Sequence, residues 1–345
     1  MKPIAITLGD VAGIGPEIIA KAFQEAPEVT RGCFVVGELS SLRRAVQWVR
    51  PVGEPAWPVV VIDTPQEALQ VPPRCIPLLS VAALDTPVPV GRISAEAGRL
   101  AGVCVTWAAR AALRGEIAAL VTAPLHKEAL SAARAPYDAF PGHTELLQAE
   151  AAAHLGRTVA EVPVRMMLAN DELRTVLVSI HLSLRAALNA VTLDNVLQTL
   201  RITHVSLRSL LGRPPRIGVA GLNPHAGEGG LFGHEEIEII APAIAQARAE
   251  GIEASGPHAP DTVFMRARSA AGKPGEFDVV VAMYHDQGLI PVKYLGVDKG
   301  VNVTLGLPLV RTSPDHGTAF DIAGTGRADA ASLIEAIRMA RQLAV

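Results

Sequence analysis

The chain opens with Ile4-Ala-Ile-Thr-Leu-Gly-Asp-Val-Ala-Gly-Ile-Gly-Pro-Glu17, a short apolar run followed by a glycine-rich turn. The apolar run is typical of a buried strand, and Pro16 suits the first turn of a following helix. A strand that passes directly into a helix is half of a β-α-β unit. The glycine spacing matches neither the dinucleotide-binding pattern nor the phosphate-binding loop of nucleotide hydrolases, so the turn by itself predicts no nucleotide site.

The same alternation of apolar runs and amphipathic segments continues along the chain and predicts an α/β fold with a largely parallel sheet. Residues 164–169 and 173–180 flank a turn-favouring Asn-Asp pair, which predicts an antiparallel hairpin within that pattern. The other expected strands are residues 4–8, 33–36, 59–62, 76–79, 118–122, 216–220, 277–283 and 301–305. The expected helices are residues 17–24, 94–113, 145–154, 192–211, 235–250 and 328–343.

The bulk composition narrows the class of protein. A length of 345 residues suggests two domains, and 49% hydrophobic residues with 19% charged ones allow a large core. The net charge of −3 gives no reason to expect nucleic acid, and no apolar run is long enough for a membrane span. The N-terminus does not resemble a signal peptide, and the three scattered cysteines are typical of reduced core residues. We therefore expect a cytoplasmic protein.

Three histidines follow expected strands or open turns. They lie in Val178-Ser-Ile-His-Leu-Ser-Leu184, Gly221-Leu-Asn-Pro-His-Ala-Gly-Glu-Gly-Gly230 and Ala282-Met-Tyr-His-Asp-Gln-Gly288. Ligands of open α/β sheets bind beyond the carboxyl ends of the strands, so these imidazoles have the positions needed to converge on one divalent metal. They lie too far apart in the sequence for a zinc finger, so the fold must assemble any such site. Each histidine taken singly is more often an ordinary loop residue than a metal ligand.

Two further segments carry polar groups suited to anions. In Phe140-Pro-Gly-His-Thr-Glu145, Thr144 has the position of a helix N-cap, and a helix N-terminus can hold a phosphate. Residues 283–317 place cationic, amide and carboxylate side chains among glycines and prolines, which predicts functional loops at strand ends. Arginine suits bidentate capture of carboxylate or phosphate, and lysine acts as a compact point charge.

Together these motifs resemble the 4-hydroxythreonine-4-phosphate dehydrogenase family, NAD-dependent enzymes of pyridoxal phosphate biosynthesis. The resemblance covers nearly the whole chain, and its most specific parts are residues 221–228, 284–288 and 301–308. The family usually has proline at position 11, where this chain has valine, a change that should not affect the chemistry. The resemblance implies two α/β lobes around an active-site cleft, as in isocitrate and isopropylmalate dehydrogenases. We expect a first lobe of residues 1–130 plus 306–345 and a second lobe of residues 131–305 with dimerisation elements.

The resemblance also implies the site residues. The metal would be held by His181, His225 and His285, with one ligand of each site supplied by the partner of a homodimer. The substrate would be bound by His143, Thr144, Lys293, Asn302 and Arg311. Asp286 and Lys293 are candidates for proton transfer or for orienting the metal ligands, and the sequence does not separate these roles. It indicates no cofactor-binding residues.

The implied reaction is oxidation of the carbon-3 hydroxyl of 4-phosphooxy-L-threonine, followed by decarboxylation to 3-amino-2-oxopropyl phosphate. The implied cofactors are NAD, with NADP left open, and one divalent zinc, magnesium or cobalt ion per site. One alternative is a dehydrogenase of another phosphorylated four-carbon acid, such as erythronate or threonate 4-phosphate. A distant family member that oxidises an aromatic dihydrodiol fits less well, because the motifs at 141–144 and 301–304 are retained. A non-catalytic metabolite-binding protein is the alternative from another class.

Overall fold

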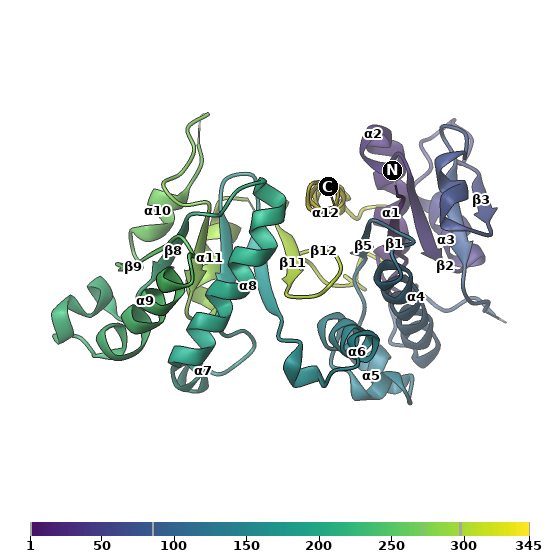
Figure 1. The fold of residues 1–345 in the computed structure, drawn as a ribbon. Coiled ribbons are helices and arrows are strands. Elements are labelled where there is room, and N and C mark those ends of the chain that lie inside the picture. Colours follow the sequence, from purple (N-terminus) through teal and green to yellow (C-terminus); the bar gives the residue numbers. More distant parts are fainter. Residues whose placement is uncertain (1, 85, 271, 297–298, 345) are drawn as a thin grey trace. The chain divides into compact units, whose positions relative to one another are not determined.

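The computed structural model describes residues 2–84, 86–270, 272–296 and 299–344. Val345, which ends the predicted first lobe, lies outside the described residues. The chain divides into two compact units (Figure 1). Unit 1 comprises Met1–Pro163 and Leu307–Ala344, and unit 2 comprises Val164–Gly306.

Unit 1 contains a parallel sheet covered by helices. Its strands are β1 (Ile4–Thr7), β2 (Cys33–Gly37), β3 (Val59–Ile62), β4 (Ile76–Ser80), β5 (Ala119–Thr122) and β12 (Arg311–Pro314). Its helices are α1 (Gly15–Glu25), α2 (Pro27–Thr30), α3 (Leu39–Trp48), α4 (Ala95–Leu113), α5 (Lys127–Ala132), α6 (His143–Leu155) and α12 (Ala331–Leu343), with 3₁₀ turns η1 (Pro65–Leu69), η2 (Tyr137–Ala139) and η3 (Val159–Glu161). The strand order is β3-β4-β2-β1-β5-β12, and every pairing in it is parallel.

The packing of unit 1 explains its extent in the sequence. α4 packs on β1, β2 and β5, while α12 packs on β5 and β12, so the buried apolar strands are shielded from water. α5 and α6 in turn pack against α4. For that reason unit 1 extends to Pro163, whereas the sequence-based division placed this boundary at residue 130. Unit 2 ends at Gly306, and unit 1 resumes at Leu307.

Unit 2 contains a mixed sheet. Its strands are β6 (Arg165–Ala169), β7 (Arg174–Leu177), β8 (Ile217–Ala220), β9 (Ala254–His258), β10 (Val279–Ala282) and β11 (Val301–Leu305). Its helices are α7 (Leu184–Ala190), α8 (Leu193–Leu211), α9 (Ala241–Ala249), α10 (Val263–Ala267) and α11 (His285–Tyr294), with a turn η4 (Pro224–Gly230) and a π-helical turn η5 (Glu236–Ile240). The strand order is β11-β6-β7-β10-β8-β9. β11, β6 and β7 pair antiparallel, and β7, β10, β8 and β9 pair parallel.

The predicted α/β class is confirmed, and each expected strand has a counterpart in the structure, including the hairpin of β6 and β7. The expectation of loops across residues 283–317 is wrong in two places. Residues 285–294 form α11, although Gly288 and Pro291 both weaken a helix, and residues 311–314 form the buried strand β12. No described helix combines the length and the apolar character that crossing a membrane requires.

Candidate active site

The three predicted metal-binding histidines follow three neighbouring strands of unit 2. β10 pairs in parallel with β7 on one side and with β8 on the other. The carboxyl ends of these strands therefore lie at one edge of the sheet, which is where open α/β sheets bind ligands. His181 follows β7, His225 lies in the turn after β8, and His285 is the first residue of the helix after β10. The topology thus brings the three histidine-bearing segments to the same edge.

His181 and His285 lie beside each other, with ring centroids 5.7 Å apart and planes inclined by 42°. A zinc–nitrogen distance of about 2.0–2.1 Å and a tetrahedral angle would place the ring centres of two histidine ligands roughly 5–6 Å apart. The observed 5.7 Å between the ring centres lies within that range. Neutral imidazole is also a ligand type that such ions accept.

Asp286 contacts the His285 ring. Its Oδ1 atom lies 2.7 Å from His285 Nδ1, although both side chains are partly exposed. An ionised carboxylate can only accept a hydrogen bond, so this contact places the hydrogen on Nδ1 and leaves the Nε2 lone pair for a ligand. Metal-binding histidines commonly have such a carboxylate partner. The geometry favours the orienting role among the two roles that the sequence left open for Asp286.

His225 stands on an unusual turn. Residues 225–229 all have positive φ, including the non-glycine residues His225 (52°), Ala226 (54°) and Glu228 (44°). This left-handed conformation is unfavourable for residues with a Cβ atom. The His225 side chain is exposed, and its ring lies 6.2 Å from that of Phe232. Across the part of the chain that the structure describes, no three histidine, cysteine, aspartate or glutamate side chains converge closely enough to hold an ion.

Arg311 is a buried cation on β12, the last strand in the order of unit 1. It is 4% exposed, and its Nε and Nη2 atoms donate to Thr122 Oγ1 over 3.1 and 2.8 Å. Burial lowers its pKa to about 10, while the carboxylate of Glu145 acts in the opposite direction. The guanidinium therefore remains charged at neutral pH. A buried positive charge of this kind is stabilised by an anionic ligand.

His143 lies in the electrostatic field of that cation. Burial, and to a smaller extent the charge of Arg311, hold the pKa of His143 well below 6.5, so the imidazole is neutral at pH 7. Its buried Nε2 atom has no hydrogen-bond partner among the described residues. The Nε2 atom of His143 can therefore form a hydrogen bond with a ligand that binds next to Arg311. This unused capacity supports its predicted place in a substrate site.

The start of α6 differs from the predicted capping. The N-cap is Gly142, with no side-chain capping bond, and Thr144 lies one residue inside the helix after His143. The expectation that Thr144 caps the helix is therefore wrong. A glycine N-cap costs only a few tenths of a kcal/mol relative to threonine, so the helix can start there. Without a capping side chain, the first N–H groups of α6 are left to an external acceptor, which suits an anion.

The remaining predicted residues lie in unit 2. Lys293 is exposed near the end of α11, and Asn302 is half-buried on β11 opposite Leu168. Sequence reasoning missed Thr122 and Glu145, which act on Arg311. Thr122 could have been found as a polar residue that ends a buried strand, and Glu145 as an acidic residue in a helix's first turn.

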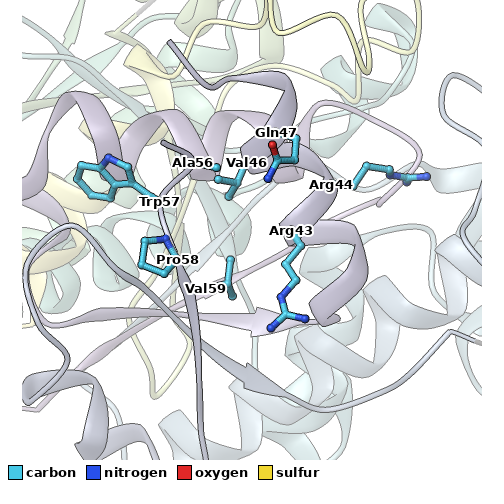
Figure 2. A pocket seen from close by; sticks show the side chains of 8 residues that line it. All are labelled: Arg43, Arg44, Val46, Gln47, Ala56, Trp57, Pro58 and Val59. Atoms are coloured by element: carbon cyan, nitrogen blue, oxygen red, sulfur yellow. The ribbon is translucent and has the colours of Figure 1, made fainter. Parts of the chain in front are cut away.

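A separate pocket of about 460 Å³ lies between α3 and the residues leading into β3 (Figure 2). Its lining includes Arg43, Arg44 and Trp57. None of the predicted substrate or metal residues lines it. Arg44 is engaged elsewhere, since its Nη1 donates to Val88 O over 2.9 Å and its guanidinium stacks over Trp48. We therefore assign none of the predicted substrate or metal residues to this pocket.

Comparison with known proteins shows which family the chain belongs to. The family model described as pyridoxal phosphate biosynthetic protein PdxA matches residues 30–340. The chain belongs to the PdxA family. Within the family, it is 51% identical to the 4-hydroxythreonine-4-phosphate dehydrogenase of Beijerinckia indica, over 99% of this chain and 95% of that protein. It is 45% identical to the D-threonate 4-phosphate dehydrogenase of Salmonella typhimurium, over 99% of both chains.

A solved structure agrees with this membership. The 4-hydroxythreonine-4-phosphate dehydrogenase of Klebsiella pneumoniae superposes with a TM-score of 0.86 at 43% identity and 100% coverage of both chains. The predicted resemblance to this PdxA family is thereby confirmed.

Proposed function

We propose that this PdxA-family chain is a metal-dependent oxidoreductase that acts on a CH–OH group. Its substrate would be 4-hydroxythreonine 4-phosphate, which is oxidised at carbon 3 with NAD or NADP. The β-keto acid formed would lose carbon dioxide to give 3-amino-2-oxopropyl phosphate for pyridoxal phosphate synthesis. We place this activity in the cytoplasm.

The observation that carries the proposal is that three parallel strands, β7, β10 and β8, lie next to one another in the sheet. Each of these strands is followed by a histidine-bearing segment. The 5.7 Å between the ring centres of His181 and His285 is compatible with two ligands of one ion and supports the proposal. When bound, a divalent ion lowers the pKa of a substrate hydroxyl and polarises the ketone that oxidation produces. Zinc, cobalt and magnesium are the candidates, and imidazole ligands favour the first two.

The chain's own residues would bind and orient the substrate. Arg311 offers a buried guanidinium, and His143 a neutral imidazole, for the phosphate or carboxylate. Thr144 adds a hydroxyl at the start of α6, and Lys293 and Asn302 complete the predicted set. Asp286 would fix the His285 ring, which leaves Lys293 as the candidate for proton transfer.

We further propose that the site is shared between the subunits of a homodimer. His181 and His285 lie together in one chain, whereas His225 forms no three-residue cluster with them among the described residues. His225 is therefore the ligand that we expect the partner subunit to supply. A shared ligand makes the dimer a condition for a complete site.

A second substrate has support from one relative. The 45% identical protein of Salmonella typhimurium is named for D-threonate 4-phosphate, in which a hydroxyl stands at carbon 2 in place of the amine. Both candidates carry a phosphate and a carboxylate, so the cationic residues suit either one. The group at carbon 2 is what separates them.

The test is a turnover assay with purified protein, each phosphorylated four-carbon acid, NAD or NADP, and Zn²⁺, Co²⁺ or Mg²⁺. We expect reduced cofactor to appear most efficiently with 4-hydroxythreonine 4-phosphate. A higher kcat/KM with threonate or erythronate 4-phosphate would transfer the proposal to that acid. No turnover with any of these acids, combined with tight binding of one of them, would favour a metabolite-binding protein.

A further inference from the structure

Gln287, in the first turn of α11, makes hydrogen bonds in two directions. Its Oε1 atom accepts from the backbone N–H of Met283 over 2.7 Å, just before the helix. Its Nε2 atom donates to the carbonyl of Gly221 over 2.8 Å. Gly221 directly follows β8 and begins the segment that carries His225. One side chain therefore joins the start of the His285 helix to the base of the His225 turn.

Only the first of these contacts is explained by helix capping. A glutamine at the third helical position commonly reaches back to the N–H groups that precede the helix, as the Oε1 atom does here. The Nε2 contact reaches Gly221, a residue 66 positions earlier that directly follows the neighbouring strand β8. It adds nothing to the helix end. It fixes the relative position of two ligand-bearing segments.

Two other buried side chains extend this connection. Ser179, which lies between β7 and His181, donates from Oγ to the carbonyl of Met283 over 3.0 Å. On the other side, Glu236 is 3% exposed, and its Oε1 atom accepts from the N–H groups of Leu222 and Asn223 over 2.6 and 2.7 Å. All three histidine-bearing segments thus belong to one connected set of hydrogen bonds.

The contacts of Glu236 also reach the left-handed turn. Its Oε2 atom accepts from Asn223 Nδ2 over 2.9 Å. A Cβ atom on Gly227 would lie only 2.8 Å from Oε2, so the turn packs directly on this carboxylate. The Glu236 carboxylate therefore holds the turn at Asn223, just before it, and packs against Gly227 in its middle.

We infer that Gln287 is a positioning residue for the metal site, at the centre of a set of hydrogen bonds that includes Ser179 and Glu236. It sets the place of the His225 turn relative to His285 without contacting the ion. The inference rests on the proposed function, because it assumes that these histidines bind a divalent ion. In a two-fold dimer the same contact would fix the His225 turn that each subunit presents to its partner.

The decisive variant is Gln287→Glu. It keeps the shape and the acceptor for Met283 N–H, and so keeps the cap, but it loses the donor for the Gly221 carbonyl. The matched control is Gln246→Glu, which introduces the same charge at an exposed position of α9 in the same unit. The probe is Zn²⁺, titrated into metal-free protein in competition with a chromophoric chelator, without substrate. Thermal melting of the metal-free proteins reports separately on stability.

We expect Gln287→Glu to bind Zn²⁺ about tenfold or more weakly than the control, as for other residues that hold metal ligands in place. Its metal-free form should still melt cooperatively, which shows that the variant is folded. The added negative charge by itself would attract Zn²⁺, so charge cannot account for a loss of affinity. Affinity equal to or above that of the control would overturn the inference while leaving metal binding by the wild type intact.

A second variant covers the case in which Gln287→Glu does not fold. Ser179→Ala removes only the Oγ contact to the Met283 carbonyl and should weaken Zn²⁺ binding severalfold in a folded protein. Unchanged affinity in Ser179→Ala would then count against the inference. If the wild type itself binds no Zn²⁺, the metal site of the proposed function fails, and the positioning role fails with it.

Discussion

Asp10 gives a prediction about stability that can be worked out from its surroundings. It lies in the glycine turn after β1 and is completely buried. Its Oδ1 atom accepts from the N–H of Ala12 over 2.8 Å, while Oδ2 is buried with no hydrogen-bond partner among the described residues. Burial raises the pKa of this carboxyl from 3.8 to about 6, and the Ala12 N–H and His126 offset only part of that effect.

The direction and size of the effect follow from proton linkage. In the unfolded chain the carboxyl loses its proton near pH 3.8, whereas in the folded chain it keeps the proton until about pH 6. Between these values the folded state binds more protons, so the free energy of unfolding falls as pH rises. A shift of about two pKa units corresponds to about 3 kcal/mol. This stability is fully present below pH 3.8 and is lost as pH rises through about 6.

The perturbation is Asp10→Asn, which has the same shape and does not titrate. Urea unfolding would be followed by tryptophan fluorescence, because Trp48, Trp57 and Trp107 are the chain's three tryptophans and all lie in unit 1 with Asp10. The unfolding free energy of the wild type minus that of the variant should fall by about 3 kcal/mol between about pH 4 and pH 7. Asp63→Asn, at an exposed position of the same unit, controls for the loss of a carboxylate. A difference that stays constant across this range would refute the reasoning.

The other predictions concern the site. Purified protein should carry about one divalent ion per chain, and chelation should abolish turnover but leave the helical circular dichroism unchanged; full turnover in excess chelator would exclude the metal site. Arg311→Ala and Lys293→Ala should each lower kcat/KM about tenfold or more, mainly through KM, since a charged hydrogen bond contributes about 1.5–3 kcal/mol. The exposed Arg338→Ala is the control, and equal kinetics in all three variants would show that the anion site is misplaced. Inactive His225→Ala and His285→Ala subunits, mixed and allowed to exchange, should recover activity at one of the two sites of each mixed dimer. A monomer that turns over substrate during sedimentation would contradict the shared site.

The sequence predicts the strands well because fully buried strands consist mostly of apolar residues, which are easily recognised in the sequence. Val279–Ala282 is apolar throughout, Ile4–Thr7 is apolar except for its last residue, and both runs are fully buried. Two of the missed elements, β12 and α11, lack such an apolar run. β12 consists of Arg311-Thr-Ser-Pro314, and α11 contains a glycine and a proline, so in both places tertiary packing overrides local preference.

The sequence likewise predicts only part of the candidate site. Histidines after strands indicate one edge of a parallel sheet, and the strand order β7-β10-β8 agrees with that rule. The strand order itself was not predictable, because it depends on long-range pairing. The contacts of Gln287 and Glu236 were equally hidden, since their partners lie 66 and 14 residues away.

The left-handed backbone at residues 225–229 affects which stereoisomer of an amino acid fits each position best. Each L-residue held in this conformation costs roughly 1–2 kcal/mol relative to right-handed backbone. Ala226 is one such residue, at φ 54°. For a D-amino acid the same dihedral angles are the relaxed ones, so this short stretch is mirror-image backbone built from ordinary residues. A semisynthetic protein with D-alanine at position 226 should therefore hold the same turn with less backbone strain at that residue.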